Sequence, residues 1–573
     1  MAARSSSVPA RMVVLLLAAR GAASGPTVRT GNGTVVGTAH GAVDVFAGIR
    51  YARAPRFAAP VPVEVEGVVD ATKFGPACLQ WGLRERVIGA EECLTLNVFA
   101  PSKAGLDSTA PRAVMVFIHG GGLTSGAATT YDFKDIAAEG DVVVVSLQYR
   151  LSWAGWLAVP GSVPANNAGL LDQVAALAWV QAHVAAFGGD AARVTIFGQS
   201  AGGTSVLLLA SAPPAAGLFA RAIAQSPWWA SSQIGGIAAD VAATEIWGEC
   251  WCDVVDCAAG ADDVRRALLS ANATKLTEAC GLWVAVVPDG DAVPGPVMGA
   301  LCDGGPDPFA AALDDPGFEL LVGSNHDEYR YWLMGVGNRS ATEAAAYDDL
   351  VGYVRGNILN AYLDLSVNRT AGWTEACAAD TTADVVAAIA DAYGTSPFLD
   401  AVDFTTDFWF TVPTALAASA GRGVGAKRAR YLFENDIGAN TTVPLKTMHC
   451  TDLPYVLGFE GFVWRYNTTD EDAVRDYFHH PTPHMEATKR FVQGLWVDFA
   501  KRGFHDRDGW PRAGDTGEPH AHLHATRRVE SAAPVKTKAG FDVARALYCD
   551  TARIRAAYLG ACEAGVAPAA FAR

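Results

Sequence analysis

The stretch Val194-Thr-Ile-Phe-Gly198-Gln-Ser200-Ala-Gly202 decides how this chain folds. Residues 194–197 predict a buried strand, and the small residues around Ser200 predict a sharp turn into a helix. Such a turn is so tight that only small residues, usually glycine, fit two positions before and after the serine. The turn exposes the serine oxygen above the end of the strand, at a helix N-terminus. Ser200 is therefore a candidate nucleophile.

Short apolar runs rich in valine and isoleucine recur on both sides of this motif. We expect them to be strands covered on both faces, because they are apolar at successive positions. Helical patterns at residues 170–184 and 204–209 lie between them. Alternating strands and helices predict a mostly parallel α/β sheet with helices on both faces and reactive groups at the carboxyl ends of the strands. The runs are residues 113–118, 142–147, 194–197, 319–322 and 430–433.

Three consecutive glycines follow another predicted strand, in Phe117-Ile-His-Gly120-Gly121-Gly122. Taken alone they could be a flexible turn. Next to the serine motif they predict an oxyanion hole, because backbone without side chains lets two N–H groups converge on a developing negative charge. The N–H of Ala201, at the start of the predicted helix, would be a third donor.

A nucleophilic serine needs a neutral imidazole to take its proton, and the imidazole needs a carboxylate to orient it. In hydrolases with this serine turn, the acid and then the histidine follow the serine along the chain. Asp327 and Glu328 both lie just beyond the strand at 320–322, and these residues alone do not choose between them. Chain order favours His449 as the base. The other candidates are His326, His479, His480 and His484, whereas His520, His522 and His524 are expected on a solvated loop.

Composition describes an ordinary folded protein. Of 573 residues, 50% are hydrophobic and 18% charged, which excludes disordered and fibrous classes. The formal charge of −16 makes a nucleic-acid partner unfavourable. No repeat or long linker divides residues 25–573, so we expect a single domain there.

The N-terminus and six asparagines indicate the secretory pathway. Residues 1–24 have the basic, apolar and small-residue layout of a signal peptide. No later apolar run reaches 18 residues, so no stable membrane anchor is expected and the protein is predicted to be secreted. Asn-x-Ser/Thr acceptors for glycans begin at Asn32, Asn272, Asn338, Asn368, Asn440 and Asn467.

Eleven cysteines agree with an oxidising compartment, and their odd number leaves at least one without an intramolecular partner. Short loops favour the pairs Cys78 with Cys93 and Cys549 with Cys562. No metal is predicted, because the Cys250-x-Cys252 spacing lacks ligands to complete a site. Spacing does not pair Cys250, Cys252, Cys257, Cys280, Cys302 or Cys377.

The sequence resembles the type-B carboxylesterases, a family of α/β hydrolases that includes cholinesterases, fungal lipases and non-enzymatic adhesion proteins. The resemblance covers nearly the whole chain after residue 25. It implies the α/β-hydrolase fold and a serine hydrolase that acts on small-molecule esters without a cofactor. The alternatives are a triacylglycerol lipase or a non-catalytic adhesion or binding homologue. Besides the serine and glycine motifs, the similar segments are 47–52, 91–98, 149–151, 167–173, 187–190, 222–226, 496–501 and 509–511.

The resemblance also assigns roles to individual residues. It implies Ser200 as nucleophile, Glu328 rather than Asp327 as the acid and His449 as the base. It implies that Ser226 supports the carboxylate. The remaining implied roles are oxyanion donors at Gly121, Gly122 and Ala201, and an N-terminal disulfide between Cys78 and Cys93.

Four features depart from the family pattern. Gln199 stands where the family usually has glutamate, which removes a charge beside the nucleophile and weakens any choline-ester assignment. Cys450 replaces a small residue directly after His449. Pro227, followed by Trp228 and Trp229, predicts an unusual wall for the acyl pocket, and the loop between Cys78 and Cys93, which contains Trp81, is short.

Overall fold

The structure is a computed structural model that describes most of residues 25–549. The predicted signal peptide, Trp228, Trp229 and Cys562 lie outside the described residues. The described ranges are 25–82, 86–102, 110–157, 167–227, 248–256, 259, 261–281, 284, 286–294, 317–333, 352, 375–394, 403–419, 427–434, 447–459, 478–504, 520–524, 527–531 and 538–549.

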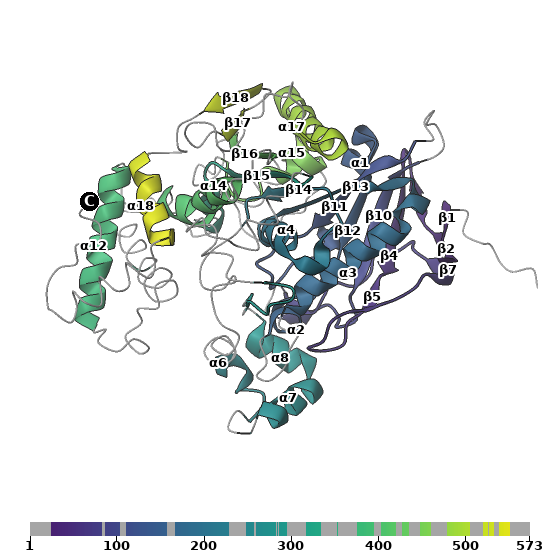
Figure 1. The fold of residues 1–573 in the computed structure, drawn as a ribbon, viewed down its shortest axis with the longest axis horizontal. Coiled ribbons are helices and arrows are strands. Elements are labelled where there is room, and N and C mark those ends of the chain that lie inside the picture. Colours follow the sequence, from purple (N-terminus) through teal and green to yellow (C-terminus); the bar gives the residue numbers. More distant parts are fainter. Residues whose placement is uncertain are drawn as a thin grey trace, which may run out of the picture.

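An eleven-stranded sheet forms the centre of the described part, in the order β18-β17-β16-β15-β14-β13-β11-β12-β10-β4-β3 (Figure 1). Neighbours from β17 to β12 in this order are parallel, and the pairs at both edges are antiparallel. The mostly parallel sheet is as predicted. The strands are β3 Thr38–His40, β4 Val43–Arg50, β10 Thr95–Pro101, β11 Arg112–Ile118, β12 Val143–Leu147, β13 Gly189–Gln199, β14 Arg221–Gln225, β15 Glu319–Asn325, β16 Lys427–Glu434, β17 His520–His524 and β18 Arg527–Ser531.

One prediction about the edge of the sheet was wrong. His520, His522 and His524 do not lie on a loop but form β17, which pairs in parallel with β16 from Tyr431 to Glu434. Histidine at every second position is compatible with the side-chain period of a strand.

Alternate residues of the strands enter two separate hydrophobic cores. On β11, Val114 and Val116 belong to one core, whereas Met115 and Phe117 belong to the other. Apolar residues at successive positions therefore place helices on both faces of the sheet, as predicted (Figure 1). The first core includes α3 Ala168–His183, α4 Ala201–Ser211 and α14 Val412–Ser419, and the second includes α1 Lys134–Gly140, α15 Leu453–Leu457 and α17 Pro483–Arg502.

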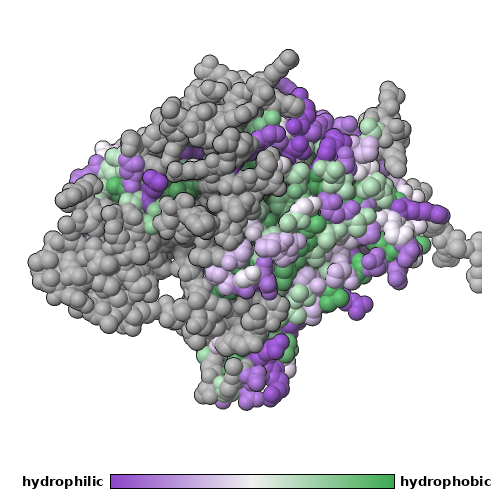
Figure 2. Space-filling view, in the orientation of Figure 1, coloured by the Kyte–Doolittle hydropathy of each residue, from purple (hydrophilic) through white to green (hydrophobic). Residues whose placement is uncertain are grey.

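Smaller elements surround the sheet. Helices α12 Glu375–Tyr393 and α18 Lys538–Cys549 lie side by side at one end of the molecule (Figure 1). Hydrophilic residues gather over α7 Ala261–Ser270, whose Asp262, Asp263, Arg265 and Arg266 are exposed (Figure 2). The others are β1 Thr27–Thr30, β2 Asn32–Val36, β5 Ala52–Arg53, β6 Val61–Pro62, β7 Glu66–Asp70, β8 Gln80–Gly82, β9 Arg86–Ile88, α2 Ser152–Trp156, α6 Gly248–Trp251, α8 Ala273–Cys280, the 3₁₀ helices η1 Ala128–Thr130, η2 Val184–Phe187, η3 Pro213–Ala215 and η5 Glu328–Leu333, and the π-helix η7 Asp407–Thr411.

Candidate active site

Ser200 lies at a strained turn between β13 and α4. Its φ of 58° and ψ of −127° are rarely adopted by residues that carry a side chain. The turn is closely packed against β11, because a Cβ on Gly198 or Gly202 would overlap the carbonyl oxygen of Ile118. Glycine at these two positions is therefore a packing requirement of the turn.

Backbone hydrogen bonds hold the turn in place. The Ser200 N–H donates to the carbonyl of Gln225 on β14 at 2.9 Å, and the Thr204 N–H donates to the Ser200 carbonyl at 2.9 Å. Ala201 is the first residue of α4, where a helix leaves its N–H groups without intrahelical acceptors. Its N–H is thus available to a group bound beside Ser200.

The glycine loop orients its peptide groups after β11. The Gly120 carbonyl lies 2.9 Å from Nδ1 of His119, and the Gly121 carbonyl accepts the N–H of Thr124 at 3.1 Å. In a trans peptide the following N–H points away from the carbonyl. The N–H groups of Gly121 and Gly122 therefore point away from these partners. Both residues have positive φ, 114° and 64°, which favours glycine.

This loop lies against the serine turn. A Cβ built on Gly120 would come within 3.1 Å of the Ser200 Cβ. The structure thus brings the loop that contains Gly121 and Gly122 to the turn that contains Ser200 and Ala201. Such a grouping of backbone donors can stabilise an oxyanion that forms on a group attached to the serine.

Glu328 and His449 form a buried hydrogen-bonded pair. Nδ1 of His449 lies 2.6 Å from Oε2 of Glu328, and Oε1 of Glu328 accepts the backbone N–H of Asn325 at 2.6 Å. The two segments also pair through the backbone, because the His449 N–H donates to the Glu328 carbonyl at 3.2 Å. With its proton on Nδ1, the ring keeps a lone pair on Nε2, as a general base requires.

Asp327, the other carboxylate at this strand end, has different partners. Its Oδ2 lies 2.9 Å from Nδ1 of His326, and its Oδ1 accepts Nε of Arg330 at 3.3 Å. The contact with His449 is thus made by Glu328. The remaining candidate bases, His479, His480 and His484, are exposed.

The other ring nitrogen of His449 faces Gln199. Nε2 of Gln199 lies 3.0 Å from Nε2 of His449 and 3.4 Å from its Nδ1. Phe410 and Tyr331 flank the ring, with centroid distances of 5.0 and 5.7 Å. Because Ser200 follows Gln199 directly, the ring stands beside the serine turn. Sequence reasoning marked Gln199 as a departure from the family pattern but did not place it against the histidine.

Asp452 is a second buried carboxylate near this pair, and sequence reasoning missed it. Its oxygens accept Nε2 of Gln225 at 2.6 Å and Nδ2 of Asn325 at 3.4 Å. Burial, with a smaller contribution from the charge of Glu328, raises the pKa of Asp452 to about 6, although both hydrogen bonds oppose the rise. The short spacing from His449 was the only available signal.

Ser226 lies at the end of β14, fully buried and with a φ of 44°. Its N–H donates to the Gly323 carbonyl at 2.7 Å. Within the described part of the chain its hydroxyl makes no hydrogen bond. Its support of the carboxylate stays a prediction.

Two disulfides join described cysteines. Cys78 is bonded to Cys93, the pair expected from the sequence. Cys250 is bonded to Cys280 and connects α6 to α8, a pairing that spacing did not reveal. Cys450 is a buried free thiol. Cys549 is also disulfide-bonded, and its predicted partner Cys562 lies outside the described residues.

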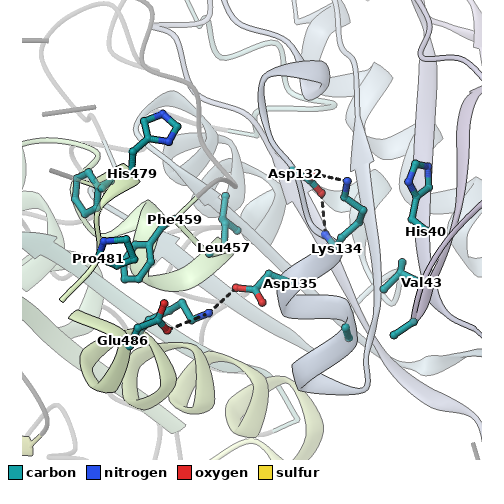
Figure 3. A pocket seen from close by; sticks show the side chains of 15 residues that line it. His40, Val43, Asp132, Lys134, Asp135, Leu457, Phe459, His479, Pro481 and Glu486 are labelled. Atoms are coloured by element: carbon teal, nitrogen blue, oxygen red, sulfur yellow. Dashed lines mark hydrogen bonds and ion pairs between the residues drawn. The ribbon is translucent and has the colours of Figure 1, made fainter. Parts of the chain in front are cut away.

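A separate pocket of about 520 Å³ lies on the face of the sheet covered by α17. Figure 3 shows Asp132 and Lys134 pointing toward each other on its wall. The ammonium group of Lys489, another lining residue, pairs with Asp135 at 2.9 Å and with Glu486 at 3.6 Å. The described lining of this pocket does not include Ser200, Glu328 or His449. It is thus distinct from the serine turn.

A known protein family matches nearly the whole chain. The model of the carboxylesterase family matches residues 24–540. The chain belongs to the carboxylesterase family, and its α/β-hydrolase fold is the one expected from the resemblance.

The chain matches less than half of the length of the curated relatives named here, whereas a solved structure matches it over most of its length. Over 249 residues the chain is 44% identical to carboxylesterase 3 of Homo sapiens, covering 39% of this chain and 43% of that protein. It is 44% identical over 214 residues to para-nitrobenzyl esterase of Bacillus subtilis, covering 35% of this chain and 43% of that protein. The solved carboxylesterase of Geobacillus stearothermophilus has a TM-score of 0.66 and 26% identity, over 91% of this chain and 99% of that one.

Proposed function

We propose that this chain is a carboxylic ester hydrolase that acts on small-molecule esters through an acyl-enzyme at Ser200. The observation that carries the proposal is the buried 2.6 Å contact between Glu328 and His449, whose ring stands beside the serine turn. Membership of the carboxylesterase family supports it, since relatives with this fold are named as esterases.

The proposed reaction assigns one task to each group. His449 takes the proton of the Ser200 hydroxyl while the serine oxygen attacks the ester carbonyl, and Glu328 stabilises the imidazolium. The N–H groups of Gly121, Gly122 and Ala201 donate to the oxyanion. His449 then protonates the leaving alcohol, and water attacks the acyl-enzyme with the same ring as base. The bond between the acyl carbon and the Ser200 oxygen then breaks, His449 returns its proton to that oxygen, and the carboxylic acid is released.

A covalent probe and an ester assay test this proposal together. A fluorophosphonate should label the protein at Ser200, and Ser200→Ala should abolish labelling and lower kcat by about 10⁶-fold. Failure to label the folded wild-type protein would instead support a binding scaffold without activity.

Neighbouring carboxylates supply a matched control. We expect Glu328→Gln to lower kcat by about 10⁴-fold, because a carboxamide no longer stabilises the imidazolium, and Asp327→Asn to have a much smaller effect. Steady-state hydrolysis of p-nitrophenyl acetate measures both. The opposite ranking would assign the acid to Asp327.

We also propose that the protein passes through the secretory pathway. The disulfides Cys78–Cys93 and Cys250–Cys280 support an oxidising compartment, and residues 1–24 supply the predicted signal. Of the predicted glycan acceptors, Asn32 and Asn272 are exposed in the structure. N-terminal sequencing of the secreted protein and its mass before and after deglycosylation test this assignment.

A further inference from the structure

Two residues that depart from the family pattern contact each other beside the candidate base. Sγ of Cys450 donates to Oε1 of Gln199 at 3.2 Å. The amide nitrogen of the same Gln199 side chain lies 3.0 Å from Nε2 of His449. All three side chains are buried. The two departures therefore form one chain of contacts that ends on the imidazole.

The contacts favour one direction of donation. A thiol donates better than it accepts, so the Gln199 oxygen faces Cys450 and its NH₂ faces the ring. The NH₂ group can only donate, so it requires the ring nitrogen Nε2 to carry a lone pair. The ring proton is then on Nδ1, where Glu328 accepts it. Each donor in this series of hydrogen bonds, from Cys450 to Glu328, meets an acceptor.

The environment keeps the thiol a donor. Burial, together with the charges of Asp452 and Glu328, raises the pKa of the Cys450 thiol well above its ordinary value. It therefore stays protonated at neutral pH. Cys450 also has a φ of 71°, a conformation that favours glycine. A cysteine is held in this strained position with its thiol on Gln199.

We propose that Gln199 and Cys450 are positioning residues that fix the resting tautomer of His449, with the proton on Nδ1 and with the Gln199 amide donating to the Nε2 lone pair until the Ser200 hydroxyl takes its place. A proton on Nε2 would face the donating NH₂ group of Gln199, so these contacts favour the tautomer that is protonated on Nδ1. This inference rests on the proposed function of His449 as the base. It predicts activity at lower pH than a glutamate at position 199 would permit.

Other groups around His449 also influence whether its ring is protonated. Glu328 faces the ring from η5 and favours the imidazolium, as does Asp452 in its charged form. Tyr331 packs on the ring from η5 and Phe410 packs on it from η7. Tyr431 on β16 interacts with Glu328 and Asp452, and burial raises its pKa well above its ordinary value.

The pH profile of kcat/KM, measured with p-nitrophenyl acetate, tests the proposal. Gln199→Glu should raise the midpoint of the acidic limb by about 1–2 pH units, because a carboxylate accepts from a protonated Nε2. Cys450→Gly removes the thiol but suits the positive φ, so the variant should fold. It should raise the midpoint by about 0.5–1 unit, because the freed carboxamide can turn its oxygen to the ring. Cys450→Ser keeps a donor and should restore the wild-type midpoint.

Three controls separate this role from packing and from the neighbouring acid. Val456→Ala removes buried volume from α15, which follows His449 along the chain, and should leave the midpoint unchanged. The double variant with Gln199→Glu and Cys450→Gly should match Gln199→Glu alone. In an Asp452→Asn background the Cys450→Gly shift should persist, which excludes Asp452 as its cause.

The outcomes distinguish this proposal from the proposed function. If wild-type protein reacts with a fluorophosphonate and hydrolyses the ester, but Cys450→Gly has the wild-type profile, the positioning role is wrong and the esterase assignment stands. The role is also wrong if Cys450→Ser behaves like Cys450→Gly. If no labelling or hydrolysis occurs, the esterase assignment itself fails.

Discussion

Asp452 illustrates how one buried residue links stability to pH. Burial is the main reason that its pKa is raised to about 6, and the charge of Glu328 adds to it. Its partners Gln225 and Asn325 donate to it through their amide groups. The carboxylate is thus held by hydrogen bonds but is costly to ionise.

A raised pKa stabilises the fold where the group is protonated. For Asp452 this contribution is complete below the ordinary value of 3.8 and is lost as the pH rises through about 6. The shift corresponds to roughly 3 kcal/mol. Asp452→Asn stays neutral, so we expect wild-type stability relative to this variant to fall by about that amount from pH 4 to 7. Urea unfolding at several pH values measures the difference, and a difference independent of pH would contradict it.

Some residues of the candidate site could be predicted from the sequence and others could not. Ser200 was predicted because the serine turn needs glycine at fixed positions, and this requirement is local. The choice between Asp327 and Glu328 needed a family resemblance, since both carboxylates follow the same strand. The contact between Gln199 and Cys450 depends on how segments distant along the chain pack together. No local rule contains that information.

At the scale of elements, apolar runs predicted the central strands because both faces of those strands are buried. The same runs did not reveal the antiparallel edges of the sheet, where partner choice depends on connections. The sequence predicts His520, His522 and His524 on a solvated loop, yet residues 521–524 pair with β16. β17 is paired on both sides, with β16 and β18, yet its residues lack the continuous apolar run of the central strands.

The disulfide between Cys250 and Cys280 fastens α6 to α8 away from the central sheet. These residues are 30 positions apart, so the bond restricts a sizeable loop of the unfolded chain. Replacing both cysteines by serine should lower stability by about 3 kcal/mol. Thermal and urea unfolding under non-reducing conditions measure the loss.

Loss of this disulfide should affect stability but not activity. We expect kcat of the variant with Cys250→Ser and Cys280→Ser to stay near that of the wild type at temperatures where the variant is folded. The reason is that α6 and α8 contribute no residue to the proposed triad. Equal stability of the variant and the wild type would show that the bond does not constrain the native protein.

At the scale of the whole molecule, Arg150 connects three segments that are distant along the chain. Its guanidinium donates to Asp172 on α3 at 2.7 and 2.8 Å and to the carbonyl of Pro55 at 2.7 Å. The neighbouring Tyr149 donates its hydroxyl to the carbonyl of His119, which precedes the glycine loop. The pair of Arg150 and Asp172 thus joins the segment after β12 to α3, and Tyr149 separately holds the residue that precedes the glycine loop.

Asp172→Asn should destabilise the protein by about 3–5 kcal/mol, because it leaves the buried Arg150 charge without its counterion. A matched control is Asp190→Asn, which removes the partly exposed pair with Arg193 and should change stability by less than about 1 kcal/mol. Replacing Arg150 by Met together with Asp172→Leu should cost less than Asp172→Asn alone, because no buried charge is then unpaired. Urea unfolding of the three variants measures this order. If Asp172→Asn costs no more than Asp190→Asn, this buried pair does not stabilise the connection between the three segments.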